Sequence, residues 1–394
     1  MKHILVIPSW YPPYDGGSFF RKRWEEMKSR GWKVGIVYVE QRSVRNLNVK
    51  SLFTSFFKVT ANNENGLFVI RMHAWSLPKL ARLQQKLWVI LMMKLVKRYI
   101  NEKGKPDLMH VHSAIWGSIV GRKVKGRYNI PYVLSEHRGR FTDQTKFAKS
   151  LFQPWYDSLL KYGLENTDYI LPLSKVMEPK LKSYLPKSNT KFKVIPNIVD
   201  IDFFKPSFKK KPALERRFLL VAGLTPVKGV HLLIHAFSRI IKMYPDTLLT
   251  IIGDGQDRKA LEKLVSFYSL KHNVIFLGAQ SHYQVKQELE QSSFLVLASL
   301  AEGHPNVSCE AMAMGVPVLT TSVVSEDIVT SDTGIIVGPD SIDELEKGLI
   351  KAIQTRGHFD SIKIRKFAIK NFSYDIVFNQ IESVYNDVLK DYEN

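Results

Sequence analysis

Short runs of β-branched and other apolar residues alternate along the chain with longer amphipathic stretches. Strands of a parallel sheet are buried on both faces and read as continuous apolar runs, so this alternation predicts parallel sheets covered by helices. The first unit is a strand at 4–7, a Pro- and Gly-rich loop at 8–17, a helix at 18–30 and a strand at 34–39. Later strands of the same sheet are expected at 69–72, 108–111, 132–134, 169–171 and 193–195.

The pattern starts again after a linker that contains Pro196, Pro206 and Pro212. Five more strands are expected at 218–222, 248–252, 274–277, 294–297 and 316–319, and 372–389 reads as a helix. The predicted fold class is therefore α/β, with two doubly wound, Rossmann-like domains at 1–200 and 201–371 that face each other across a cleft. Ligands of such sheets bind beyond the carboxyl ends of the strands, so the two domains are expected to build one site between them.

The 394 residues, 45% of them hydrophobic, fit two globular domains and argue against a disordered or fibrous chain. The single cysteine, Cys309, excludes an intramolecular disulfide and a cysteine-rich zinc site. The apolar run at 87–93 is too short to span a bilayer, and the first residues lack the apolar region of a signal peptide. We therefore expect a cytoplasmic protein whose membrane contact, if any, is at the surface.

The charge is concentrated in one half of the chain. Residues 1–200 carry 35 Lys and Arg against 14 Asp and Glu, whereas the second half is close to neutral, for a formal net charge of +20. This asymmetry suggests an anionic membrane surface, a nucleic acid or a phosphorylated substrate as a partner of the first half, with a solvated basic surface as the plain alternative. The helix expected at 79–99 reads either as a buried helix with a basic outer face or as one that faces a membrane.

The segment 299–318 holds the most informative chemistry. A strand ends near Ser299, and Pro305 and Asn306 are suited to begin a helix that runs to Met314. Free amides at Val307 and Ser308 in its first turn are expected to suit a phosphate group. Of the two carboxylates, Glu302 lies in the loop and Glu310 on the helix, so they are expected to contact different parts of one ligand.

The segment from Glu302 to Glu310 and its continuation at 311–318 resemble the E-x7-E motif of retaining glycosyltransferases of family four, which have the GT-B fold and include bacterial capsule, exopolysaccharide and O-antigen enzymes. Further similar segments lie in order along the chain at 8–13, 16–20, 107–113, 131–137, 195–200, 228–237 and 251–255. The resemblance implies a nucleotide-sugar donor, UDP- or GDP-linked, held mainly by the second domain.

By this similarity, Glu310 contacts the ribose and Glu302 the transferred sugar. The sugar and diphosphate are then held by Gly303, His304, Pro305, Asn306, Val307 and Ser308. His304 replaces the aromatic or apolar residue usual in the family, so it either influences the choice of donor or simply packs. A carboxylate accepts hydroxyl hydrogen bonds and helix-start amides suit phosphate, which agrees with these roles.

Other positions also match the family pattern. Lys228 corresponds to the lysine that reaches the leaving diphosphate, or else is a surface lysine, whereas Gly223 stands where an arginine is usual. His112 corresponds to the histidine beside the transferred sugar, and His110, two residues earlier on the same strand, is expected to project to the same side. Gly16 and Gly17 of the first loop read either as a phosphate loop or as a simple turn. His137 is a second histidine that could face the cleft, and Gly253 lies in a turn expected near the nucleotide base.

The implied activity is transfer of a hexose to a lipid-linked, phosphorylated glycan in cell-surface polysaccharide synthesis, without a metal ion or cofactor. The C-terminal helix, to about residue 394, is expected to cross back onto the first, acceptor-binding domain. The alternative, motivated by Gly223 and by the basic first half, is a non-catalytic scaffold subunit of a membrane complex. No recognition motif supports a nucleic-acid partner, and the family pattern argues against a sugar-nucleotide epimerase on the same fold.

Overall fold

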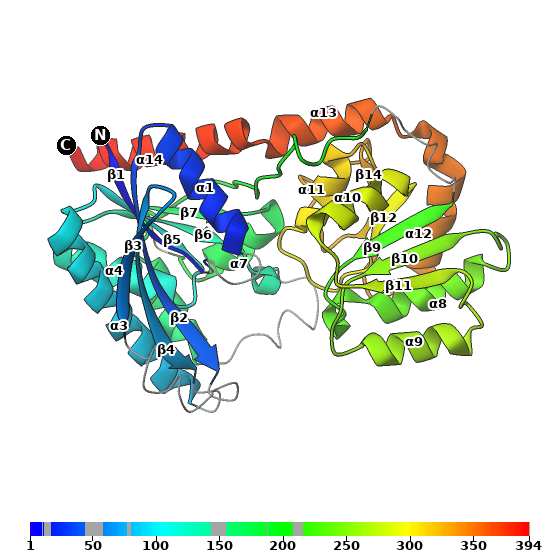
Figure 1. The fold of residues 1–394 in the computed structure, drawn as a ribbon, viewed down its shortest axis with the longest axis horizontal. Helices are drawn as coiled ribbons and strands as arrows, with labels where there is room; N and C mark the ends of the chain where they lie inside the picture. The colour runs from blue at the N-terminus through cyan, green and yellow to red at the C-terminus, as the bar shows by residue number, and fades with distance from the viewer. Residues whose placement is uncertain are drawn as a thin grey trace.

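Two α/β units lie side by side in the computed structural model (Figure 1). The structure describes residues 1–9, 11, 17–43, 58–76, 80–142, 155–186, 188–207 and 216–393. Among these residues, no helix is both long enough and apolar enough to cross a membrane.

The first unit is built on an eight-stranded sheet in the order β3-β4-β2-β1-β5-β6-β7-β8. All neighbouring strands are parallel except β3, which runs antiparallel to β4. The strands are β1 (His3–Ile7), β2 (Lys33–Ser43), β3 (Val59–Glu64), β4 (Leu67–Ser76), β5 (Leu108–His112), β6 (Tyr132–Glu136), β7 (Tyr169–Pro172) and β8 (Lys191–Phe192).

Helices cover both faces of this sheet. Ile4 and Val6 of β1 face a core shared with α1 (Gly17–Ser29) and α14 (Tyr374–Glu393), and Leu5 and Ile7 face the opposite core. That second core is closed by α3 (Ala81–Lys103), α4 (Gly117–Tyr128), α6 (Tyr156–Leu164) and α7 (Glu178–Ser183). The last helix of the chain therefore packs on the domain that contains the first strand, as Figure 1 shows.

The second unit has a six-stranded parallel sheet in the order β11-β10-β9-β12-β13-β14. Its strands are β9 (Arg217–Val221), β10 (Leu248–Ile252), β11 (Val274–Gly278), β12 (Phe294–Leu297), β13 (Val318–Thr321) and β14 (Gly334–Val337). One face is covered by α8 (Val230–Ile240), α9 (Arg258–Phe267) and α12 (Ile342–Thr355), and the other by α10 (His282–Gln291), α11 (Asn306–Ala313) and α13 (Ser361–Phe372).

The two chain segments that connect the units are bonded to each other. The Val199 amide donates to the Phe372 carbonyl at 2.8 Å. Arg365 of α13 donates to the carbonyls of Ile201 at 3.0 Å and Phe204 at 2.8 Å. The outgoing linker is thus held against the helices that return to the first domain.

The predicted fold class is confirmed, and the differences lie at sheet edges. The strand expected at 193–195 is wrong, because the ladder is made by Lys191 and Phe192 instead. Lys193 and Ile195 still donate single hydrogen bonds to β7, at 3.1 and 3.0 Å. The pattern also missed β3, a polar edge strand without an apolar run, and the short β14, and it placed the start of β13 two residues early at Val316.

Candidate functional site

The loops that follow β6 and β12 bring the two domains into direct contact. A Cβ atom on Gly139 would lie 2.9 Å from the Gly303 backbone nitrogen, and one on Gly303 would lie 3.1 Å from the Gly139 nitrogen. The Ser174 hydroxyl also donates to the Gly303 carbonyl at 2.7 Å. The carboxyl ends of the two sheets therefore meet where backbone touches backbone, which is where doubly wound folds bind ligands.

Three histidine rings stack at the first domain's side of this contact. The His110 and His112 centroids are 4.4 Å apart, and those of His112 and His137 are 5.0 Å apart. His112 Nδ1 and His137 Nε2 share a hydrogen bond of 2.7 Å. His110 bonds to the Tyr385 hydroxyl and, at 2.8 Å, to Ser135 Oγ, so it connects the cluster to the core. The expectation that His110 and His112 project to the same side is confirmed.

These histidines are uncharged at neutral pH. Burial lowers the pKa of His137 to about 3 and holds the pKa values of His110 and His112 well below the usual range. The positive charge of Arg23 acts in the same direction on all three. The rings therefore offer hydrogen-bonding nitrogens without charge.

Arg23 of α1 is a buried cation. It is 1% exposed, and its Nε and Nη1 atoms have no hydrogen-bond partner in the described part of the chain. Its guanidinium lies 5.8 Å from the centre of the Trp24 ring. Burial lowers the Arg23 pKa to about 10, so the group stays charged at neutral pH.

In the second domain, the loop after β12 ends at Pro305, the N-cap of α11. The Ser308 amide donates to the Pro305 carbonyl at 3.0 Å, so the expectation of a free amide at Ser308 is wrong. The cause is a tight first turn, in which the fourth residue bonds three positions back. The amides of Asn306 and Val307 precede the first intrahelical bond, and the buried Ser308 Oγ has no partner in the described residues.

Lys228 and Glu302 form an ion pair across two loops. Lys228 Nζ donates to Glu302 Oε2 at 2.5 Å, with both side chains partly buried. The Leu300 amide also donates to the Val227 carbonyl at 2.8 Å, which joins the loops through the backbone. The two residues expected to contact diphosphate and sugar are thus neighbours that neutralise each other.

Glu310 lies on the same face of α11 as Asn306, four residues earlier. Burial raises the Glu310 pKa to about 7, so this carboxyl titrates near neutral pH. Asn306 accepts a 2.8 Å hydrogen bond from Asn197 Nδ2, in the segment that leaves the first domain. The helix that carries Glu310 is therefore tied to the domain boundary.

The glycines expected at the site differ in their surroundings. A Cβ atom at Gly223 would meet no atom within 4 Å. Gly253 has a φ of +130°, and a Cβ there would lie 1.9 Å from the Ala222 carbonyl oxygen, so backbone geometry already requires this glycine. Gly17 is the first residue of α1, and Gly16 lies outside the described residues.

His304 points into the second domain. Its ring packs edge-on against Phe372, with centroids 5.9 Å apart, and its Nε2 lies 3.8 Å from Cys309 Sγ. Burial lowers the His304 pKa to about 4. These contacts agree with the packing alternative, while its influence on the donor stays a prediction.

Sequence reasoning missed several residues that the structure brings to the domain contact: Arg23, Gly139, Ser174 and Asn197. Asn197 lies inside a segment that matched the family pattern, so its place in the order of motifs was the available signal. Arg23 stands in an amphipathic, basic helix, where arginines normally face solvent, and the sequence holds no sign of its burial.

Comparisons with known proteins agree with this architecture. Residues 25–203 match the family described as "Glycosyltransferase Family 4", and residues 202–370 match "Glycosyl transferases group 1". An uncharacterized glycosyltransferase of Methanocaldococcus jannaschii is 26% identical over 98% of both chains. The alpha-monoglucosyldiacylglycerol synthase of Acholeplasma laidlawii is 24% identical over 83% of this chain and 86% of that protein.

Solved structures show the same fold. Sucrose-phosphate synthase from Thermosynechococcus elongatus superposes with a TM-score of 0.80 at 19% identity, covering 99% of this chain and 100% of that one. Anabaena HepE in complex with UDP and glucose superposes with a TM-score of 0.73 at 16% identity, covering 98% and 100%. The fold is therefore that of GT-B glycosyltransferases.

The buried histidines predict how stability depends on pH. Their folded pKa values lie below the unfolded value of 6.5, so the unfolded state binds more protons below pH 6.5 and stability falls as the pH decreases. Each such histidine contributes up to ~1.4 kcal/mol per pH unit. Glu310 has the opposite effect on stability, because its folded pKa is raised to about 7. Between its unfolded pKa and pH 7, the folded state binds up to one proton more at Glu310 than the unfolded state does.

Chemical denaturation between pH 6.5 and 5 measures this slope. His137→Gln should reduce it by roughly 1 kcal/mol per pH unit. The exposed His272→Gln is the matched control and should keep the wild-type slope. Equal slopes in wild type and His137→Gln would contradict a neutral, buried His137.

Proposed function

We propose that this chain, which carries a glycosyltransferase family 4 domain followed by a group 1 domain, transfers a hexose from a UDP- or GDP-sugar to a lipid-linked glycan with retention of configuration. One observation carries the proposal. Side chains from distant segments converge at the Gly139–Gly303 contact, with the His112–His137 pair on one side and the Lys228–Glu302 pair and the start of α11 on the other.

The proposed donor site uses the charges of the second domain. The diphosphate lies at the start of α11, where the amides of Asn306 and Val307 and the helix dipole favour an anion. Lys228 turns from Glu302 to the diphosphate, which frees the Glu302 carboxylate to accept hydrogen bonds from the sugar hydroxyls. Glu310 accepts hydrogen bonds from the ribose hydroxyls, and neutral His112 contacts the transferred sugar from the first domain.

In the proposed reaction, the bond between the sugar anomeric carbon and the diphosphate oxygen breaks while the acceptor hydroxyl attacks from the same face. The acceptor proton passes to the leaving diphosphate, so no enzyme nucleophile is needed. Lys228 and the helix amides stabilise the charge that develops on the leaving group. No step of this proposed scheme uses a metal ion.

One feature favours a second candidate function. Gly223 leaves the donor site without the arginine that is usual in the family, and Lys228 is already paired with Glu302. A non-catalytic GT-B scaffold in a membrane glycosylation complex would need neither the arginine nor a free lysine. Nucleotide binding separates the two candidates.

The outward face of α3 supports a membrane-bound acceptor. Leu83 is 54% exposed and Ile90 63% exposed, one heptad apart, and the exposed Lys86, Lys94 and Lys97 lie along the same side. Apolar side chains flanked by lysines suit the headgroup region of an anionic membrane. A relative named as a glycolipid synthase agrees with an acceptor of this kind. We therefore propose a cytoplasmic enzyme that binds the inner face of the plasma membrane.

The donor site is tested by thermal unfolding with UDP, GDP, ADP and their sugars. A ligand that binds only the folded state at about 100 times its Kd adds ~2.7 kcal/mol, which raises Tm by several degrees. We expect a shift with one nucleotide family, and its loss in Glu310→Ala.

The matched control for this experiment is Glu262→Ala, a partly exposed glutamate on α9 of the same domain, which should keep the shift. Hydrolysis of the bound nucleotide sugar, lost in Glu310→Ala, would support an enzyme. Absence of any shift in the wild type would overturn the donor site and favour the scaffold.

Gly223→Arg should strengthen nucleotide binding about tenfold. The position has room for a side chain, and a charge-assisted hydrogen bond to the diphosphate contributes about 1.5–3 kcal/mol. Isothermal titration of the nucleotide measures the effect. Gly223→Gln, which has no charge, is the control, and an equal affinity in both variants would show that position 223 does not reach the diphosphate.

Membrane binding is tested by sedimentation with vesicles. We expect binding to vesicles with anionic lipid, weakening with added salt, and little binding to neutral vesicles. Ile90→Glu on α3 should lower the bound fraction severalfold, because it places a carboxylate among the lysines of the contact face. The control is Ile362→Glu at an equally exposed isoleucine (67%) on α13 of the second domain, and equal losses in both variants would refute an α3 contact.

A further inference from the structure

The outermost strand of the second sheet, β11, has an apolar side that remains exposed (Figure 1). Its side chains alternate between the two faces of the sheet. Val274 and Phe276 pack into the core that includes α9, whereas Ile275 and Leu277, on the opposite face, are 43% and 36% exposed. On that face α10 packs against β9, two strands further into the sheet. The edge of the domain is therefore apolar where it meets solvent.

The other sheet edges are protected in ways that β11 is not. At the edges of the first sheet, β3 is polar, with Asn62, Asn63 and Glu64, and β8 carries the exposed Lys191. In the second sheet, β14 is almost entirely buried. Charged and polar residues on an edge strand hinder pairing with another chain. Since the stretch 272–285 around β11 contains no Lys, Arg, Asp, Glu or Pro, this edge lacks that protection.

The backbone of β11 also has an open side. The Leu249 amide of β10 donates to the Asn273 carbonyl at 2.8 Å. In a parallel ladder every second residue bonds to the same neighbouring strand, so Ile275 also faces β10. Phe276, between these positions, directs its amide and carbonyl away from β10. A further strand would therefore find a donor and an acceptor at Phe276.

We infer that β11 pairs in antiparallel fashion with β11 of a second copy of this chain, about a two-fold axis at Phe276. The Phe276 residues of the two copies then exchange amide-to-carbonyl hydrogen bonds. Ile275 of each copy lies opposite Leu277 of the other, in the kind of pair in which side chains approach closely. The exposed apolar residues are thus complementary to themselves, as a two-fold interface requires.

The distribution of charge favours a second copy in this orientation. Residues 1–200 carry 35 Lys and Arg against 14 Asp and Glu, whereas the second half is close to neutral. The first domain lies beyond the carboxyl ends of the second sheet, where Gly139 meets Gly303. Antiparallel pairing points these ends in opposite directions, so the two basic domains lie far apart and repel each other weakly. Contact through the first domains would instead bring like charges together.

The surroundings of β11 can enlarge this interface. A pair of five-residue strands buries less than the roughly 1,200–2,000 Å² of a stable interface. Phe267 at the end of α9 and Tyr283 in the first turn of α10 are 77% and 62% exposed, and these helices directly precede and follow β11. We expect both rings to join the contact.

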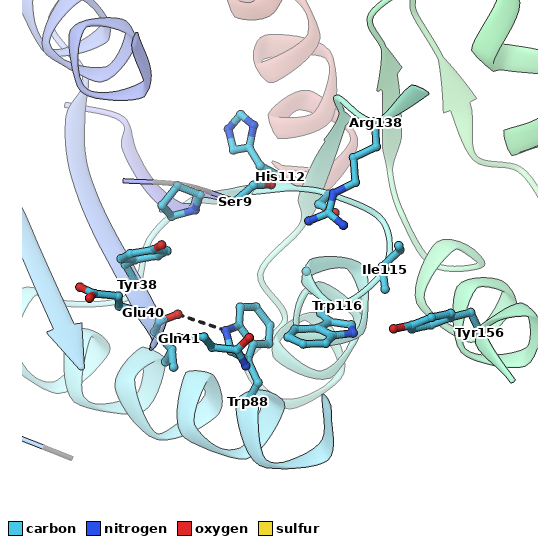
Figure 2. A pocket seen from close by; sticks show the side chains of 14 residues that line it. Ser9, Tyr38, Glu40, Gln41, Trp88, His112, Ile115, Trp116, Arg138 and Tyr156 are labelled. Carbon is cyan, nitrogen blue, oxygen red and sulfur yellow. Dashed lines mark hydrogen bonds between the residues drawn. The ribbon is translucent and has the colours of Figure 1, made fainter. Parts of the chain in front are cut away.

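The pairing leaves the transfer site open. The cavity beside His112 and Arg138, shown in Figure 2, belongs to the first domain, whereas β11 is the outer strand of the second. The inference therefore does not depend on the proposed function, and a chain without transferase activity would pair in the same way.

Sedimentation velocity of the full chain tests the inference. We expect particles of twice the 45.3 kDa mass of one chain, with a dimer Kd of about 10 µM or tighter. Ile275→Lys places a charge opposite Leu277 of the second copy and should raise this Kd about tenfold or more. The matched control is Ile362→Lys, at an isoleucine on α13 that is 67% exposed, and it should dimerise like the wild type.

Two double variants test the register of the pairing. In Ile275→Lys/Leu277→Glu each lysine lies opposite a glutamate of the second copy, whereas Ile275→Lys/Leu277→Lys places like charges opposite each other. The first variant should therefore dimerise more tightly than the second. Both positions are exposed, so each variant should keep the far-UV circular dichroism of the wild type. In the wild type, exchange of the Phe276 amide hydrogen should slow as the dimer forms.

Three results would overturn the inference: a wild type with the mass of one chain at every concentration, a dimer that Ile275→Lys leaves unchanged, or equal dimerisation of the two double variants. Vesicle binding separates a membrane from a second copy as the occupant. If Ile275→Lys lost vesicle binding and the wild type did not dimerise, β11 would be a membrane contact instead.

Discussion

The approach of Gly139 to Gly303 is the constraint on which the arrangement of the site depends. Each glycine lies in the loop that follows a strand, β6 or β12, and a Cβ atom on either would lie within 3.1 Å of the other's backbone nitrogen. His137 stands two residues before one glycine and Glu302 one residue before the other. Since both loops continue directly from buried strands, the backbone contact fixes the spacing of these functional groups across the domain boundary.

A second connection acts at a distance from the first. Arg365 on α13 holds the carbonyls of Ile201 and Phe204 in the linker and also that of Ala313, the last residue of α11. A guanidinium at the end of a helix complements the partial negative charge of its carbonyls. The linker and α13 are thus bonded to the helix whose first turn lies at the candidate donor site. A movement of one domain relative to the other would therefore also displace α11.

How well a feature of this molecule could be predicted from the sequence depends on whether the interactions that form it are local or join distant parts of the chain. Buried strands show up as apolar runs, so most of both sheets could be predicted, whereas β3 has a polar sequence and is held by pairing with β4. His112 could be placed because alternation along a strand is local. The Lys228–Glu302 pair joins positions 74 residues apart, and the burial of Arg23 depends on packing against distant elements, so neither leaves a local pattern.

The distribution of charge links these features to the proposed chemistry. In the structure, Lys228 is neutralised by Glu302, and the histidines opposite are kept neutral by burial and by Arg23. An arriving diphosphate therefore gains little from Lys228 until the ion pair opens, and opening it releases the carboxylate that the sugar hydroxyls need. Under the proposed function, one exchange couples recognition of the phosphates to recognition of the sugar, so a nucleotide without its sugar would leave Glu302 without a partner and bind less favourably.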